Sequence, residues 1–515
     1  MKKTSFWHKL RFVPCLLFLG IMVSLFLRNG DTFLRYTQEH LSKDYKAYTQ
    51  GAETYLSENL AGKHSYIDFN GAVAKLLGIN TLNDRFRLKN GYMAAFTDFG
   101  DIDASADNVK MLSDFLEQED IGFLYVYIPP KEHCFDAQVP AGYGVHNQNA
   151  TVTELAKALD ARQVNHLNPD DWFRRNGWKM EDIYFRTDHH WLPEAAFTTV
   201  RLIMERLAET GDVVFDAESL AAENWVFEVY EDYFLGADGR QTGPIYAGVD
   251  DFCVIHPKEP SEIYVGRVNP DRTMPNLDTS SIYRLAGLDG DTVYDRDPYG
   301  VYLGNNYPYA YIRNDQAVNN QRLLVIGDSY RLPAECFLIT QFSELIHVDM
   351  REYKDGSFAA LVKQVKPDQV LFLGCVPAFE KVEDFGLEGW AESFSGKVAG
   401  AACFESRQLT FGEAADGNTY SPVVEVLAAG AYQLTLEQAS FGNASSELIQ
   451  FALMDKTSGE VSCARYFVTE YSESQQWLFT VPEDGNYKIV AYHGMPGSTL
   501  GKALILDGIT LSPLA

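Results

Sequence analysis

Basic residues are scarce in this sequence, which has 43 lysines and arginines against 71 aspartates and glutamates and a formal net charge of −28. This balance excludes nucleic acid as an expected partner, because binding it requires lysine and arginine side chains that neutralise phosphates. It also disfavours broad adhesion to anionic lipid surfaces. A neutral or cationic polymer is easier for such a chain to accommodate.

Cysteine is also sparse, with seven residues spread over 515 positions and no two of them in a Cys-x-x-Cys pair. We therefore expect no structural zinc site. Cys15 lies in an apolar N-terminal run, and the other six are either ordinary buried thiols or members of a few disulfides. The apolar content of 46% is that of a globular protein, and the length allows two or three domains.

The N-terminus lacks a small-x-small cleavage site after its apolar run, which spans Phe12 to Leu27 behind four basic residues. We predict an uncleaved membrane anchor at residues 1–28, with residues 1–11 on the cytoplasmic side. The run is short against the ~20 residues of a typical spanning helix, so a cleaved signal peptide is the alternative. Both interpretations place the rest of the chain outside the cytoplasm.

Helical and strand patterns alternate through the middle of the chain. Helical spacing of apolar residues is clear at Val109–Leu116 and from Pro193 to Gly211. A continuous apolar run at residues 123–128 predicts a buried strand, and an apolar strand is predicted at residues 322–326. Two more strands are predicted at residues 347–351 and 368–374, with a further helix at 334–341. This alternation predicts an α/β fold with a largely parallel sheet flanked by helices.

The segment Thr187-Asp188-His189-His190-Trp191 places a carboxylate and an imidazole two residues apart. In an extended segment residues i and i+2 point the same way, so we expect Asp188 and His190 to share a side while His189 points away. Asp188 would then fix the tautomer of His190 and leave its other nitrogen as a base. From this stretch alone, two alternatives stay open: histidines that only pack, and a metal site of one Asp and two His.

A second motif, Gly327-Asp328-Ser329-Tyr330, directly follows the strand predicted at residues 322–326. Ligands bind at the carboxyl ends of strands in open α/β sheets, and a tight turn there would expose the serine hydroxyl and its own N–H. Together with Asp188 and His190, Ser329 supplies the acid, base and nucleophile that acyl transfer requires.

These motifs resemble those of the DHHW proteins and of the related SGNH-hydrolase-like alginate O-acetyltransferases, over roughly residues 50–380. The resemblance implies a flavodoxin-like SGNH fold at residues 29–390 and a Ser329-His190-Asp188 triad, with no cofactor and no metal. It also suggests Tyr330 and Arg351 as substrate or oxyanion contacts. The chain departs from the family pattern in having no clear Gly-x-Asn-Asp block and in carrying Leu192 where a helix-capping Thr is common.

Beyond a boundary rich in Gly, Ala and Ser at residues 385–405, the apolar period changes to two. Short alternating segments separated by turns predict a β-sandwich at residues 400–515. This region resembles the carbohydrate-binding modules that follow some alginate acetyltransferase domains. Aromatic residues there could stack on sugars, although a module that only packs against the preceding domain is the alternative.

The sequence thus predicts a membrane-anchored, extracytoplasmic serine O-acetyltransferase that modifies hydroxyls of a cell-surface or secreted polysaccharide through an acyl-enzyme on Ser329. The resemblance implies that a membrane-bound O-acyltransferase-type protein supplies the acyl group. A carbohydrate esterase with the same triad is one alternative, since only the acceptor differs. A non-catalytic polysaccharide-binding scaffold is the other.

Overall fold

The computed structural model describes most of the chain up to Cys375 and the strands that follow it. The described residues are 59–97, 100–141, 148–209, 213–268, 282–304, 306–349, 351, 358–375, 407–409, 423–440, 448–455, 461–468, 475–481, 484–493, 505–513 and a few positions before residue 59. The predicted anchor at residues 1–28 lies outside this set apart from Gly20, Val23 and Ser24. In the part of the chain that is described, no helix is long and apolar enough to span a bilayer.

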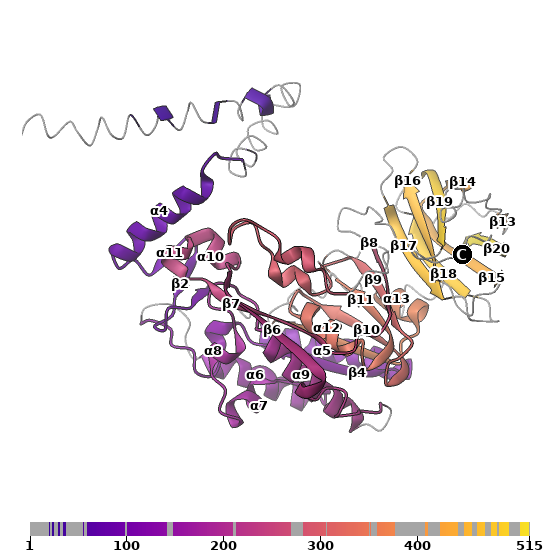
Figure 1. Cartoon of the computed structure of the whole chain (residues 1–515). Helices are drawn as coiled ribbons and strands as arrows, with labels where there is room; N and C mark the ends of the chain where they lie inside the picture. Colours follow the sequence, from indigo (N-terminus) through magenta and orange to yellow (C-terminus); the bar gives the residue numbers. More distant parts are fainter. Residues whose placement is uncertain are drawn as a thin grey trace, which may run out of the picture.

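A seven-stranded sheet forms the centre of the first region (Figure 1), in the order β5-β4-β12-β10-β11-β9-β8. Its strands are β4 (Gly122–Ile128), β5 (His166–Leu167), β8 (Ile263–Val268), β9 (Tyr309–Asn314), β10 (Asn319–Gly327), β11 (Phe342–Val348) and β12 (Gln369–Cys375). The five strands from β5 to β11 run parallel, and β9 and β8 are added antiparallel at one edge. The predicted α/β fold with a largely parallel sheet is confirmed.

Strand β4 shows why the central strands are apolar at every position. Successive side chains of a strand point to opposite faces, so a sheet covered on both faces needs apolar residues throughout. Leu124, Val126 and Ile128 enter one core, whereas Tyr125 and Tyr127 enter the other. The continuous apolar run at residues 123–128 is therefore a signature of a strand between two layers of helices.

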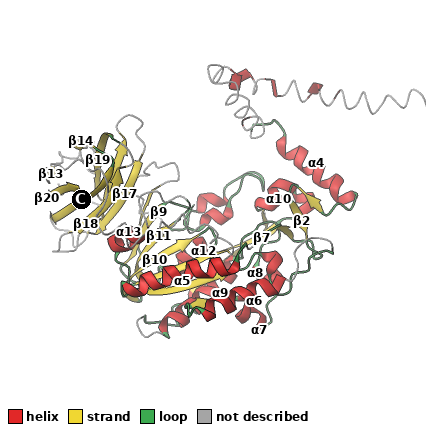
Figure 2. Ribbon diagram, turned by 180° about the vertical axis from the view of Figure 1, so that it is seen from behind, coloured by secondary structure: helices red, strands yellow, loops and turns green. Residues whose placement is uncertain are grey.

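Helices cover both faces of the sheet (Figure 2). On one face lie α5 (Ile102–Gln118), α6 (Gln148–Ala161) and α13 (Phe358–Val365), and on the other lie α9 (Pro193–Ala208) and α12 (Arg331–Leu338). In α5 the predicted stripe of Val109, Leu112 and Leu116 is buried. The carboxylate of Asp101 accepts a hydrogen bond from the Ala104 N–H and so caps the start of this helix.

Smaller elements pack around this core. They are α4 (Lys63–Leu76), β1 (Thr81–Leu82), β2 (Arg85–Arg87), β3 (Met93–Ala95), α7 (Asp170–Arg175), α8 (Met180–Ile183), β6 (Trp225–Phe234), α10 (Ala237–Thr242), α11 (Pro244–Ala247), β7 (Asp250–Pro257) and four 3-10 turns, η1 (Lys131–His133), η2 (Ala222–Asn224), η3 (Leu285–Leu288) and η4 (Pro298–Val301). Strands β1 to β3 form a small antiparallel sheet, and β6 pairs with β7. Several of these elements reach the site described below.

The C-terminal region is rich in strands, as predicted, and forms two four-stranded antiparallel sheets, β13-β20-β15-β18 and β14-β19-β16-β17. The strands are β13 (Arg407–Leu409), β14 (Val423–Leu427), β15 (Gly430–Ser440), β16 (Leu448–Asp455), β17 (Val461–Val468), β18 (Gln475–Val481), β19 (Gly485–His493) and β20 (Ile505–Pro513). Most consecutive strands alternate between the two sheets, as in a sandwich. Strands β18 and β19 belong to different sheets and therefore do not pair with each other.

Two expected element boundaries are wrong. The strand predicted at residues 347–351 is β11, which ends at Val348, because it pairs with β9 only as far as Tyr309. Asp349 and Arg351 therefore follow the strand. The helix predicted at residues 334–341 is α12, which starts at Arg331, immediately after the serine motif.

Candidate active site

Three side chains from two distant motifs form one hydrogen-bonded chain. The Nδ1 atom of His190 lies 2.5 Å from Oδ1 of Asp188, and its Nε2 atom lies 2.6 Å from Oγ of Ser329. The Asp188 carboxylate accepts a hydrogen bond from the Nδ1–H of His190, which leaves Nε2 as the acceptor for the serine hydroxyl. The structure thus brings together the three residues predicted to act in acyl transfer.

The segment that carries Asp188 and His190 is a turn, not the extended segment expected from the sequence. Its ends are joined by an antiparallel bridge between Tyr184 and Trp191. Inside it the Asp188 carboxylate accepts a hydrogen bond from the His190 N–H at 2.9 Å, the side-chain-to-backbone contact of an Asx turn. This turn places the Asp188 carboxylate beside the His190 ring. The two side chains therefore meet because of a turn, and not because of the extended segment that was predicted.

His189 does not point away from its neighbours, which corrects the expectation. Its ring lies 3.9 Å from that of His190 between centroids, and its Nδ1 lies 3.5 Å from Oδ1 of Asp188. Desolvation and the adjacent His190 ring lower the pKa of His189 to about 4, so it is neutral at pH 7. The turn folds all three side chains to one side, whereas an extended chain would separate them.

Residues distant in sequence hold the turn, which we call the histidine turn (residues 186–191). The Asp250 carboxylate accepts hydrogen bonds from the N–H groups of Arg186 and Thr187 at 2.6 and 2.8 Å. The buried ammonium of Lys131 donates to the carbonyls of Phe185 and Asp188 at 3.0 and 2.5 Å. Charged groups inside the protein therefore satisfy the backbone of this turn.

The start of α10 completes the environment of Asp188. The Ala237 N–H donates to Oδ2 of Asp188 at 2.6 Å. Gly236 packs so closely that an added Cβ would lie 2.2 Å from the Cβ of Asp188. Burial alone would raise the pKa of Asp188, but the charge of the His190 ring and the hydrogen bonds from that ring and from the His190 N–H hold it below its usual range. Asp188 is therefore a carboxylate that orients His190.

The serine lies on a second turn, the serine turn (residues 327–331), between β10 and α12. Gly327 has φ 151° and approaches the Leu373 carbonyl so closely that a Cβ would lie 1.8 Å from its oxygen. The Asp328 carboxylate accepts hydrogen bonds from the N–H groups of Tyr330 and Cys375 at 3.0 and 2.8 Å. Asp328 therefore ties the serine turn to the end of β12.

Tyr299 in η4 links the two turns, and sequence reasoning missed it. Its ring stacks on that of His190 with centroids 4.1 Å apart, and its hydroxyl donates to the Ser329 carbonyl at 3.2 Å. Tyr299 lies in a tyrosine-rich segment at residues 294–311. No local period marks it, because its role depends on contacts with residues 30 and 109 positions away in the printed sequence.

Tyr330 and Arg351, the candidate substrate or oxyanion contacts, do not belong to the hydrogen-bonded triad. The Tyr330 side chain is buried, and its hydroxyl donates to the His189 carbonyl. Arg351 makes hydrogen bonds from Nε and Nη2 to the Asp349 carboxylate at 2.9 and 2.7 Å. Both line the pocket next to Ser329, but the groups expected to contact substrate are engaged within the protein, so their roles stay predictions.

A pocket of about 350 Å³ opens over Ser329 and His189. Lys131, Glu132 and Thr97 also line it. The Thr97 hydroxyl donates to the Glu132 carboxylate, and desolvation raises the pKa of Glu132 to about 7. The pocket is large enough for a small acyl group together with part of an acceptor molecule.

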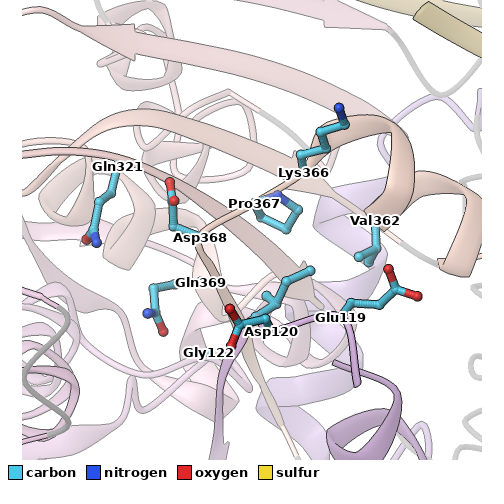
Figure 3. A pocket seen from close by; sticks show the side chains of 10 residues that line it. Glu119, Asp120, Gly122, Gln321, Val362, Lys366, Pro367, Asp368 and Gln369 are labelled. Atoms are coloured by element: carbon cyan, nitrogen blue, oxygen red, sulfur yellow. The ribbon is translucent and has the colours of Figure 1, made fainter. Parts of the chain in front are cut away.

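A larger pocket of about 710 Å³ lies at the opposite end of the parallel strands (Figure 3). Glu119, Asp120, Lys366 and Asp368 line it near the amino ends of β4 and β12. Ligands of open α/β sheets bind at the carboxyl ends of the strands, which is where Ser329 lies. We therefore place the candidate active site in the smaller pocket.

Asp188, His189 and His190 also satisfy the spacing of a metal site, since their ligand atoms lie within 4.8 Å of one another. Both ring nitrogens of His190 are already engaged, one by Asp188 and the other by Ser329. A metal at His190 would have to displace one of these hydrogen bonds. The arrangement therefore fits a proton relay better than a metal centre.

Comparison with known proteins supports the expected relationship. Residues 88–228, which include Asp188 and His190, match the family described as "SGNH hydrolase-like domain, acetyltransferase AlgX". No curated protein sequence matches the chain. The match confirms the resemblance to SGNH-hydrolase-like acetyltransferases and supports an acetyltransferase-type domain.

Similar solved structures carry related descriptions. PatB1 of Bacillus cereus is 22% identical with a TM-score of 0.49, covering 59% of this chain and 98% of that chain. A DHHW family protein from Eubacterium siraeum is 22% identical with a TM-score of 0.44, covering 59% and 97%. AlgX of Pseudomonas aeruginosa is 13% identical with a TM-score of 0.34, covering 83% and 93%.

Proposed function

We propose that this protein is an extracytoplasmic serine O-acetyltransferase that modifies hydroxyls of a polysaccharide. The observation that carries the proposal is the hydrogen-bonded chain from Asp188 through His190 to Ser329, beside a pocket at the carboxyl ends of the parallel strands. The matched acetyltransferase family supports the reaction class.

The first half-reaction forms an acyl-enzyme. Ser329 Oγ attacks the carbonyl carbon of the acyl donor while its proton moves to Nε2 of His190. Asp188 stabilises the resulting imidazolium through the hydrogen bond to Nδ1. The tetrahedral intermediate collapses as the leaving group departs with the proton held by His190, which leaves the acetyl group as an ester of Ser329.

The second half-reaction transfers the acetyl group to the acceptor. A sugar hydroxyl enters the pocket and gives its proton to Nε2 of His190 as its oxygen attacks the ester carbonyl. Collapse of the second intermediate returns the proton to Ser329 Oγ. Neither step requires a metal or an organic cofactor, and the same groups would hydrolyse the ester if water replaced the sugar.

The remaining parts of the proposal concern the cell envelope. We propose that residues 1–28 anchor the chain, that a membrane-bound O-acyltransferase-type protein supplies the acetyl group, and that the C-terminal sheets bind polymer. The apolar N-terminal run and the resemblance to polysaccharide acetyltransferases support these points. Protease added to intact cells should digest the chain beyond residue 30, and in untreated cells the protein should be found in the membrane fraction.

One experiment tests the reaction directly. Full-length protein is incubated with 4-nitrophenyl acetate, with and without neutral oligosaccharides, and both protein and sugars are analysed by mass spectrometry. We expect acetyl on Ser329 and acetylated oligosaccharide. Free acetate with no sugar product, at any acceptor concentration, would favour the esterase, and no acetyl-enzyme at all would favour the non-catalytic scaffold.

A further inference from the structure

A buried ionic cluster contacts the backbone of the serine turn, and its members are not among the residues that line the pocket. Its members are Arg331, Glu335 and His347, and all three side chains are fully buried. Arg331 Nε lies 3.1 Å from the Glu335 carboxylate, which also lies 2.6 Å from Nδ1 of His347. Burying charges is costly, and such clusters do not usually add stability over apolar residues of similar size. A role other than stability therefore has to be sought in what the cluster touches.

The geometry fixes how the cluster is protonated. Arginine can only donate, so Nε2 of His347, 2.7 Å from Nη2 of Arg331, must accept. The proton of the neutral imidazole is then on Nδ1, where it donates to Glu335. Glu335 and His347 thus hold two sides of the guanidinium and leave its Nη1 directed toward the serine turn.

The Nη1 atom of Arg331 contacts the backbone of the serine turn itself. It donates to the carbonyl of Gly327 and, at 2.8 Å, to that of Asp328. The Asp328 carbonyl belongs to the same peptide unit as the N–H of Ser329. In a trans peptide these two groups point in opposite directions. A carbonyl held by the buried guanidinium therefore leaves the N–H of Ser329, a residue that lines the pocket, pointing away from the guanidinium.

The Ser329 N–H is available for substrate. Within the described residues no hydrogen bond from this N–H is formed, whereas the adjacent N–H groups of Tyr330 and Arg331 donate to the side chain and carbonyl of Asp328. Oxyanion holes of acyl-transfer enzymes use such backbone donors. A charge-assisted hydrogen bond to the carbonyl also polarises the peptide unit, which makes its N–H a stronger donor.

We infer that Arg331 is a positioning residue for the proposed reaction: it orients and polarises the Asp328–Ser329 peptide so that the Ser329 N–H stabilises the oxyanion. The inference rests on the proposed function, because it assigns an oxyanion donor to the acyl transfer at Ser329. It also accounts for a chain without a Gly-x-Asn-Asp block, since the peptide donor is strengthened from behind by a buried charge.

The test compares full-length wild type, Arg331→Lys and a matched control, Arg322→Lys, in the hydrolysis of 4-nitrophenyl acetate. Lysine keeps the charge, but as a point donor it cannot hold His347 and two carbonyls at once. Losing a whole oxyanion donor costs about 10²–10³ in kcat, so a weakened donor should cost about ten- to a hundredfold, with KM little changed. Arg322 on β10 forms an ion pair with Glu344 on β11 at 2.7 Å, remote from the serine turn. Arg322→Lys should therefore keep the wild-type kcat.

A spectroscopic readout separates positioning from mere folding. The infrared carbonyl stretch of the acetyl-enzyme, trapped at low pH, reports the hydrogen bonds made to the acyl oxygen. In Arg331→Lys this band should move to higher wavenumber, because a weaker donor polarises the carbonyl less. An unchanged band together with wild-type kcat would overturn the inference.

A second variant covers the case in which Arg331→Lys does not fold. In Arg331→Met/Glu335→Met the whole ion pair is replaced by apolar side chains of similar volume, a change that buried pairs often tolerate. The folded double variant should show the same loss of kcat and the same band shift, and wild-type behaviour would overturn the inference. Wild type and Ser329→Ala report on the proposed function separately: turnover that depends on Ser329 but not on Arg331 refutes the inference alone, whereas turnover that survives Ser329→Ala refutes the proposed function.

Discussion

The two turns of the candidate site are held in different ways. The histidine turn is held by groups far away in the sequence, since Asp250 binds the Thr187 N–H and Oγ1, and Lys131 binds the Asp188 carbonyl. Ala237 adds a backbone donor to Asp188 itself. Each of these contacts spans about 50 residues or more, so the histidine turn acquires its shape only when the tertiary structure assembles.

The serine turn is held mainly by its own residues. Asp328 accepts from the Tyr330 N–H two positions on, and Arg331 donates to the Asp328 carbonyl three positions back. Longer-range hydrogen bonds add to these: the Cys375 N–H at the end of β12 donates to Asp328, and the Tyr299 hydroxyl donates to the Ser329 carbonyl. A strand followed at once by a helix thus places the nucleophile, while dispersed residues place the base. Substitutions at the two turns should therefore separate chemistry from positioning.

Removing the nucleophile should have the largest effect. Ser329→Ala deletes one partly exposed hydroxyl, so the fold should be intact while acetyl-enzyme formation is lost, with kcat for 4-nitrophenyl acetate down by about 10⁴ or more. Circular dichroism checks the fold, and intact mass after incubation with the ester checks the acetyl adduct. An acetyl adduct of normal yield in this variant would show that the two turns do not form one catalytic unit.

The two histidines of the histidine turn should differ strongly. His190→Ala should behave like Ser329→Ala, because it removes the only base hydrogen-bonded to the serine hydroxyl in the described part of the chain. His189→Ala should retain most activity, since its half-exposed ring is not in the relay. Steady-state rates of both variants, with and without a chelator, give the answer. An essential His189, or activity that disappears with the chelator and returns with zinc, would favour the metal interpretation.

Adding one methyl group beside each turn, by Gly236→Ala or Gly374→Ala, should lower kcat by different amounts. Gly236→Ala places a Cβ 2.2 Å from the Cβ of Asp188, so the carboxylate must move away from His190 and kcat should fall by about ten- to a hundredfold. The matched change on the serine side, Gly374→Ala, meets only the carboxylate of Asp328 at 3.3 Å and should cost much less. Equal losses in the two variants would mean that Asp188 is not held in place by α10.

The sequence predicted what depends on local pattern. The apolar run at residues 123–128, the helix starting at Pro193 and the serine after strand β10 all follow from periodicity or from strand-end position, and the structure has each of them. The turn at residues 186–191 was mistaken for an extended segment because an Asx turn and a strand both bring residues i and i+2 together.

The supporting residues could not be predicted in the same way. Asp250, Gly236, Tyr299 and Arg331 act through contacts that the fold creates, and no hydrophobic period or short motif marks them. The antiparallel edge strands β8 and β9 were missed for a related reason, since β8 pairs across about 45 residues of intervening chain.

The last prediction concerns the stability of the protein and Glu132, which lines the pocket and follows Lys131 in the chain. Desolvation raises the pKa of this carboxyl from 4.5 to about 7. Between these two values the folded protein keeps a proton that the unfolded chain has lost, so stability falls as pH rises through this window. The fall amounts to about 3 kcal/mol at most, from 1.36 kcal/mol per pKa unit. Glu132→Gln mimics the protonated form and should not show it.

The comparison is made by urea unfolding of wild type and Glu132→Gln at pH 5 and pH 8. Relative to wild type, the variant should gain stability at pH 8 and show little difference at pH 5, because only the charged form of Glu132 is penalised by burial. Exposed Glu223, changed to Gln, serves as the control and should show no such difference. A pH 8 gain equal to the pH 5 value would mean that Glu132 ionises normally. It would then be fully ionised in the pocket that it shares with Ser329 at pH 7, instead of about half ionised, and would oppose more strongly the negative charge that develops there.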